Sequence, residues 1–89
     1  YKRQIYEFKI QISASKTLLP LKKYNFNGLT NLSVKKEGSI YKYFFGSTSN
    51  YNEAKKLLRK SKNYGYRSSF IILEKNGETY DLEKYLNEL

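Results

Sequence analysis

Apolar and polar residues alternate along residues 8–15, which read FKIQISAS. The apolar side of this stretch consists of Phe8, Ile10, Ile12 and Ala14. The polar side consists of Lys9, Gln11, Ser13 and Ser15. A period of two residues predicts a strand with one buried face. The polar face carries little charge for a surface that only has to keep the protein soluble.

Three further stretches predict strands. Residues 32–36 and 40–46 flank the turn KEGS, in which Gly38 can adopt a positive φ, so together they predict a hairpin. Residues 68–74, which read SSFIILE, predict a fourth strand that ends at the turn KNGE.

Two other stretches have helical spacing. Asn50 and Glu53 stand at the spacing of a capping box, and apolar residues then recur at helical intervals, which predicts a helix over residues 51–63. Residues 80–89 predict a short terminal helix, with Asp81 as its cap.

Residues 16–31 contain Pro20 and apolar residues without helical spacing. Because proline breaks a helix interior, this segment is predicted to be an irregular connection with room for one helical turn. Leu18, Leu21 and Phe26 are the residues expected to anchor it in the core.

The order of these elements predicts an α+β domain with a four-stranded antiparallel sheet. The helix over residues 51–63 would cover one face of the sheet and leave the other face open. The domain would span residues 8–80, between a lead-in over 1–7 and a helical extension over 81–89. Strand and helix parity predict that the core contains Ile10, Ile12, Tyr43, Phe45 and Leu57.

The charge of the chain is unevenly distributed. The formal net charge is +9, but the last sixteen residues hold five acidic and two basic residues, so the first 73 carry 15 basic and 3 acidic residues and a balance of +12. Such a surface attracts a polyanion or an acidic partner. A solvated lysine surface with no partner has the same composition, and both interpretations remain open.

The composition narrows the possible chemistry. Without cysteine or histidine, the chain has no disulfide framework, no zinc knuckle and no Ser-His-Asp or Cys-His centre. The basic part has only the carboxylates Glu7, Glu37 and Glu53, in the lead-in, a turn and a helix cap, so we expect a binding domain and not an enzyme. We expect no cofactor or metal, and no membrane span because no stretch of about 18 apolar residues is present.

Three segments, in this order, resemble the SPOR (sporulation-related repeat) domain, especially the version at the C-terminus of Bacteroidetes N-acetylmuramoyl-L-alanine amidases. FKIQISAS resembles the first strand of that family. GSIYKYFFGSTSNYNEAKKLLRKSKNYGY resembles its long block of strand, serine-rich turn and helix, and SSFIILEKNGE resembles its closing strand and turn. The likeness covers about residues 8–80.

The resemblance implies a ferredoxin-like (RNP-like) βαββαβ fold whose first helix is degenerate here, as Pro20 and Gly28 indicate. It also implies binding to septal peptidoglycan, at glycan strands stripped of their stem peptides. The location would be the periplasm or cell envelope, and the parent a cell-wall amidase or division protein with its catalytic domain elsewhere. In the family, the contact lies on the open face of the sheet.

The resemblance also implies roles for particular residues. The glutamine of the family's first strand is Gln11, its small polar neighbour is Ser13, and the basic residue of its third strand is Lys42. The sequence departs from the family at Phe44, where a polar or basic residue is usual. This departure replaces a hydrogen-bonding position with an apolar one.

Strand parity independently predicts a shared surface of Lys9, Gln11, Ser13, Lys42 and Phe44. Gln11 can donate and accept hydrogen bonds, which suits hydroxyl and acetamido groups. Lys42 can pair with the lactyl carboxylate of a muramic acid that has lost its peptide. Phe44 offers a flat face to a sugar ring, unless the parity slips and places it in the core.

The alternative function is binding of single-stranded nucleic acid. An open four-stranded sheet with aromatic residues and basic charge is also the surface that RNA-recognition domains use. Residues 40–46, however, lack the basic-Gly-aromatic-Gly-aromatic order of that family. We therefore expect a monomeric glycan-binding domain.

Overall fold

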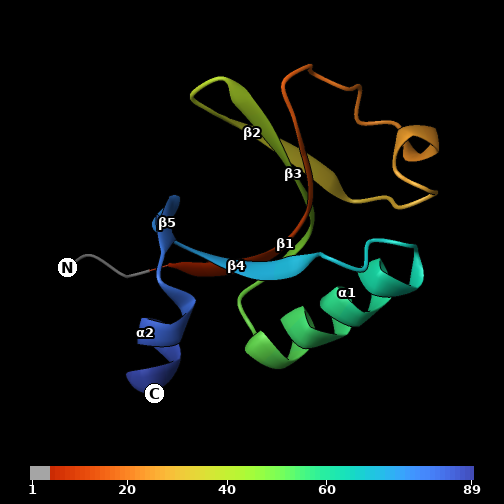
Figure 1. Cartoon of the computed structure of the whole chain (residues 1–89). Helices are drawn as coiled ribbons and strands as arrows, with labels where there is room; N and C mark the ends of the chain where they lie inside the picture. The colour runs from red at the N-terminus through yellow and green to blue at the C-terminus, as the bar shows by residue number, and fades with distance from the viewer. Residues whose placement is uncertain (1–4) are drawn as a thin grey trace.

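The computed structural model describes residues 5–89 and contains one bent antiparallel sheet with two α-helices (Figure 1). The strands, in spatial order β2-β3-β1-β4-β5, are β2 (Leu32–Glu37), β3 (Ile40–Thr48), β1 (Tyr6–Ser15), β4 (Phe70–Lys75) and β5 (Glu78–Tyr80). The remaining elements are the 3₁₀ turn η1 (Lys23–Asn25), helix α1 (Tyr51–Asn63) and helix α2 (Leu82–Asn87).

The structure confirms a small α+β fold, and its strand order is compatible with a ferredoxin-like arrangement. The expectation of four strands is wrong, because β5 adds a fifth at the edge beside β4. Asn76 and Gly77 form the turn between them, both at positive φ, as tight hairpin turns require. A strand of three residues is too short to show a period of two residues. The Asn-Gly pair, which is typical of hairpin turns, was the sequence signal for a further strand.

Both predicted helices are present. Helix α1 has the predicted bounds, and its cap Asn50 accepts a hydrogen bond from the Glu53 N–H at 3.1 Å. Asp81 caps α2 in the same way, through the Lys84 N–H at 3.1 Å. Neither helix in the described part of the chain is long and apolar enough to cross a membrane.

Strand β1 begins at Tyr6, so the last two residues of the predicted lead-in 1–7 belong to the sheet. Residues 1–4 of that lead-in lie outside the described residues. The other predicted strand bounds differ from the observed ones by one or two residues.

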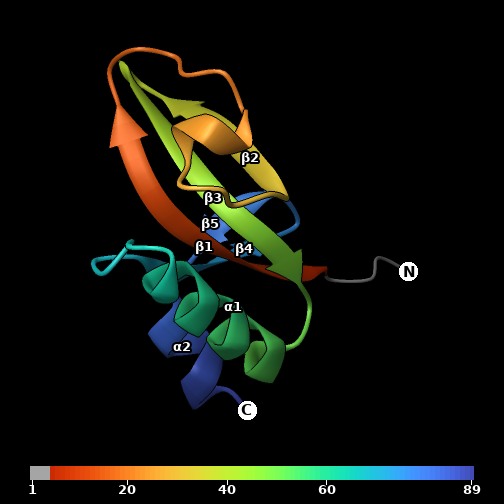
Figure 2. The same cartoon turned by 90° about the vertical axis from the view of Figure 1, so that its right-hand side faces the viewer.

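The core lies on one face of the sheet. Ile10, Ile12, Tyr43 and Phe45 are buried as predicted, whereas Leu57 is only partly buried at the edge of their cluster. A second cluster, around Phe8, Ala54 and Leu73, continues the same face toward α2. Figure 2 shows α1 and the η1 segment in front of this face.

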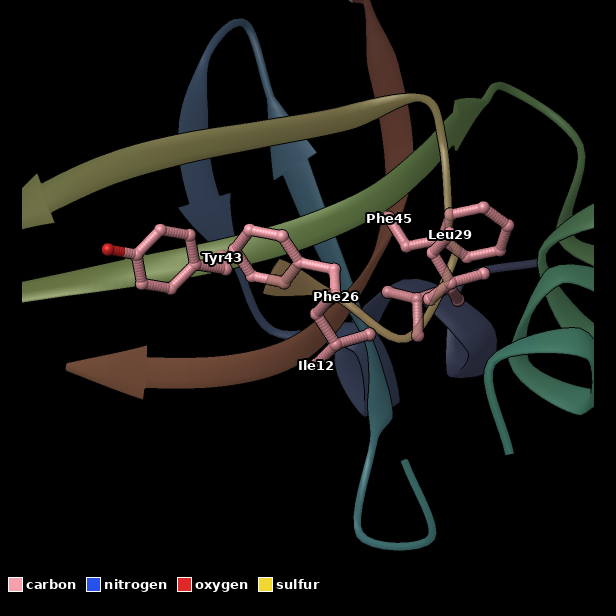
Figure 3. Close-up of a cluster of buried hydrophobic side chains, with 6 residues drawn as sticks. Ile12, Phe26, Leu29, Tyr43 and Phe45 are labelled. Carbon is pink, nitrogen blue, oxygen red and sulfur yellow. The ribbon is translucent and has the colours of Figure 1, made fainter. Parts of the chain in front are cut away.

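The irregular connection over residues 16–31 packs part of its length on the core face of the sheet. Phe26 and Leu29 are fully buried against the ring of Tyr43 and its neighbours (Figure 3). The expected anchors Leu18 and Leu21 are instead exposed, because this stretch meets the core through its backbone, at the Tyr43 hydroxyl. Only Phe26 of the three expected anchors lies in the core.

Two bulges bend the central strands. In β1, one extra residue stands between Gln11 and Ser13 relative to β3, and in β3 one extra residue stands between the partners of Phe8 and Ile10. The bulged stretch of β3 contains Gly46, whose φ is +71°. Bulges of this kind bend a strand and increase its twist, and Figure 1 shows β1 curving strongly along its length.

The Ile12→Ala variant is expected to lose about 2–5 kcal/mol of unfolding free energy, as large-to-small changes in a core do. Ile12 is buried in the cluster that joins the sheet to Phe26 and Leu29. The measurement is chemical denaturation, and a loss below about 1 kcal/mol would contradict the assigned core face.

The Gly46→Ala variant is expected to lose about 2–5 kcal/mol of unfolding free energy, from left-handed backbone strain and overpacking together. A Cβ at this position would lie 2.8 Å from Leu57 Cδ1. Gly38→Ala is the matched control, since Gly38 also has a positive φ (+60°) but open space around it. Chemical denaturation should show a clearly smaller loss for Gly38→Ala, and equal losses would mean that the Leu57 contact contributes nothing.

Candidate functional site

The uncovered face of the sheet is concave and carries a groove of about 240 Å³. Side chains from all five strands line it: Gln11, Glu37, Lys42, Phe44, Phe70, Ile72 and Thr79. The bend of the sheet produces this shape, because it brings the β2–β3 hairpin toward β4 and β5. The groove is the candidate functional site.

A chain of ion pairs crosses the concave face. Lys9 Nζ lies 2.9 Å from Glu74 Oε1, and Lys35 Nζ lies 3.6 Å from Glu74 Oε2. Lys35 is also 4.0 Å from Glu37 Oε1, and Lys42 Nζ is 2.6 Å from Glu37 Oε2. Three lysines and two glutamates therefore alternate across the face, with one positive charge in excess.

Glu74 is the centre of this network. Its side chain is only 6 % exposed, and it contacts Lys9 on the neighbouring strand β1 and Lys35 on β2, which does not pair with β4. A buried carboxylate is stable only when it is paired or hydrogen-bonded. Glu74 therefore joins β4 to β1 and to the distant strand β2.

The charge of Glu37 is held by its lysine partners. The hydrogen bond from Lys42 has the largest effect and lowers the pKa of Glu37 below its ordinary value of 4.5. Desolvation opposes this, and the positive charges of Lys42 and Lys35 lower the pKa further. Glu37 is thus an ionised hydrogen-bond acceptor at neutral pH. The sequence predicts a turn at Glu37, whereas this residue is the last one of β2.

The register shows which predicted site residues share the face. Gln11 stands between Phe44 of β3 and Phe70 of β4, and Lys42 lies two residues before Phe44. Lys9 also points to this face, where its Nζ lies 5.8 Å from the centre of the Phe44 ring. Four of the five predicted residues are therefore brought together.

Ser13 is the exception. The bulge at Ile12 shifts the register, so that Ser13 aligns with the core residue Tyr43 and Ala14 aligns with Lys42. The expectation that Ser13 shares a face with Gln11 is wrong for this reason. Simple alternation cannot reveal a bulge, because the extra residue changes the face of every residue after it.

Phe44 lies on the predicted face, but it is only 4 % exposed. The neighbouring Lys9 covers part of its ring, so Phe44 forms the floor of the groove and not a free platform. Phe70 is the exposed aromatic residue of this face, at 49 %. Alternation along residues 70–74 places Phe70, Ile72 and Glu74 on one side of the strand. This pattern in the sequence could have identified them as members of the site.

No family model, curated protein or solved structure matches this chain. The resemblance to the SPOR domain therefore rests on the three sequence segments alone. No group of acidic, histidine or cysteine side chains within residues 5–89 could hold a metal ion.

The Glu74→Gln variant is expected to lose about 1–3 kcal/mol of unfolding free energy. Breaking a buried ion pair costs about 3–5 kcal/mol, but Lys9 and Lys35 are partly exposed and can turn to water, which reduces the loss. Glu78→Gln, on exposed β5, is the control and should change stability by less than about 0.5 kcal/mol. Equal values for both variants in denaturation would show that the network does not stabilise the bend.

The Glu37 carboxyl should titrate below 4.5 in a pH series followed by NMR, and Lys42→Ala should move its pKa toward 4.5. The stabilisation from this pair is complete above pH 4.5 and is lost as the pH falls through the lowered pKa. Lys35→Ala should cause a smaller rise than Lys42→Ala, since Lys42 supplies the largest effect. A midpoint that is the same in all three proteins would exclude the pairing.

Proposed function

We propose that this chain is a glycan-binding module that directs a cell-wall protein to septal peptidoglycan whose stem peptides have been removed. The observation that supports this proposal best is the groove across the uncovered sheet face, with Gln11, Lys42 and Phe70 along it. In this proposal the fold is a divergent βαββαβ unit. Residues 16–31 replace the first helix, and β5 and α2 are additions.

The side chains of the groove suit a sugar chain. The exposed ring of Phe70, next to Ile72, offers an apolar surface to one face of a pyranose ring. The amide of Gln11 can donate to and accept from hydroxyl and acetamido groups. Glu37 and Lys42 add a charged acceptor and a charged donor for hydroxyl groups, which form stronger hydrogen bonds than neutral pairs.

The size and charge of the groove suit an extended polymer. Its volume of about 240 Å³ is smaller than the roughly 300–1,000 Å³ of pockets that enclose a drug-sized ligand, so it fits one part of a longer chain. The excess of one lysine in the network supports pairing with a single carboxylate, such as the lactyl group of muramic acid. Stem peptides on that carboxylate would remove the charge and obstruct the groove.

The same features argue against the two other functions. Glu37 and Glu74 already pair with the lysines of the concave face and leave one of three unmatched, so this face offers few cations to a run of phosphate groups, and single-stranded nucleic acid is disfavoured there. Catalysis by a glycosidase needs a carboxylic acid with a raised pKa, whereas the pKa of Glu37 is lowered. A binding role without catalysis is the function that the groove supports.

The test is binding to purified sacculi, before and after amidase treatment. The Gln11→Ala, Lys42→Ala double variant is expected to lose one to several decades of affinity for treated sacculi, since it removes contacts worth about 0.5–3 kcal/mol each. Phe70→Ala should also weaken binding. The melting temperature should change little, because Phe70 is exposed and Gln11 and Lys42 are partly exposed, so their removal leaves no cavity in the core.

A control variant carries the same chemical changes on α1: Asn52→Ala with Lys62→Ala, both exposed. It should bind treated sacculi like the parent chain. If the groove variant also binds normally, the groove is not the glycan site. If single-stranded RNA binds with steep salt dependence and competes with sacculi, the nucleic-acid function replaces the glycan function.

A further inference from the structure

Residues 16–24, which run into η1, expose apolar side chains that folding alone does not explain. Within seven residues, Leu18 is 55 % exposed, Leu21 is 40 % exposed and Tyr24 is 78 % exposed, and Leu19 is also among the exposed residues. Contiguous exposed apolar side chains on a small protein usually mark an interaction surface. We call residues 16–24 the leucine segment.

The backbone of the leucine segment is held in place. The Tyr43 hydroxyl accepts a hydrogen bond from the Leu19 N–H at 2.7 Å and donates one to the Thr17 carbonyl at 3.2 Å. The Asn25 amide donates to the Pro20 carbonyl at 3.0 Å. Because Tyr43 is fully buried in the core, the leucine segment is tied to the centre of the fold while its side chains point to water.

The surroundings of these side chains are basic. The sequence has no acidic residue between Glu7 and Glu37. Lys16, Lys22 and Lys23 flank the exposed leucines, and none of the three has an ion-pair partner among residues 5–89. Leu21, Lys22 and Lys23 also line a hollow of about 240 Å³ that continues to Leu32.

From this combination we infer that the leucine segment docks on the surface of an anionic lipid bilayer. Leu18, Leu21 and Tyr24 would enter the boundary between headgroups and acyl chains, where leucine and tyrosine side chains are stable. The three lysines would contact lipid phosphates, with each lysine contributing roughly fivefold in affinity. The complementary charge favours an anionic membrane over a neutral apolar partner.

Docking of this kind leaves the groove free. Phe26 and Leu29, which follow the leucine segment, pack on the core face of the sheet, whereas the groove lies on the opposite face. Figure 2 shows the η1 segment in front of the sheet, on the side of α1. One molecule could therefore contact a bilayer and a glycan strand together, but the inference does not depend on glycan binding.

The experiment is co-sedimentation of the 89-residue chain with vesicles of phosphatidylcholine that contain about 30 % phosphatidylglycerol, a fraction chosen to give the negative surface potential that attracts basic segments. The chain should bind these vesicles and not vesicles of phosphatidylcholine alone. Leu18→Ser with Leu21→Ser should lower the affinity at least about tenfold, as loss of buried apolar surface predicts. Both residues are exposed, so the fold is retained, which thermal melting checks.

A charge control separates local docking from general attraction. Lys22→Gln with Lys23→Gln should lower affinity for anionic vesicles by more than tenfold, whereas Lys55→Gln with Lys56→Gln, on α1, should lower it much less. The inference is overturned if the parent chain does not bind, if the leucine variant binds equally, or if both lysine pairs have equal effects. It is also overturned if sedimentation equilibrium shows a dimer that Leu18→Ser with Leu21→Ser abolishes, because the segment would then bind a second copy.

Discussion

In a straight antiparallel sheet, Lys35 and Glu74 could not meet. Lys35 lies at the level of Ala14 in β1 and Glu74 at the level of Glu7, which are about 23 Å apart along a straight strand. The side-chain atoms Lys35 Nζ and Glu74 Oε2 nonetheless lie 3.6 Å apart. Two side chains cannot span that length of strand, so the sheet has to fold toward its own uncovered face. The two bulges of β1 and β3 supply the bend, and the groove, the buried glutamate and the concave shape all follow from it.

The bend and the ion-pair network depend on each other. Without the bend, Glu74 would face water and would have Lys9 as its nearest partner, since only Lys9 lies on the adjacent strand. With the bend, Glu74 is buried and is matched by lysines from both sides. A buried charge is costly, and alternative packings that leave it unpaired are disfavoured. The glutamate therefore favours one specific curvature more than it adds stability.

Much of the fold could be read from the sequence, because its main signals are local. The period of β1 and the capping residues of α1 act within a few residues, and both elements appear near their predicted bounds. The bulge at Ile12 could not be predicted, because it depends on how β1 and β3 align across the sheet. Ser13 was misplaced for that reason, and the pairing of Glu74 with Lys35 depends on the same long-range geometry.

The sequence predicted most of the residues that share the uncovered face, but not which of their charges are already paired. Gln11 and Lys42 share the uncovered face, yet Lys42 is already paired with Glu37. Three lysines face two glutamates in the groove, so most of the basic balance of the first 73 residues lies outside the groove, much of it on α1 and the leucine segment. Long-range attraction from such outer charges accelerates encounter with any anionic surface. The balanced groove can then select a ligand by the geometry of its hydrogen bonds, which uniform positive charge could not do.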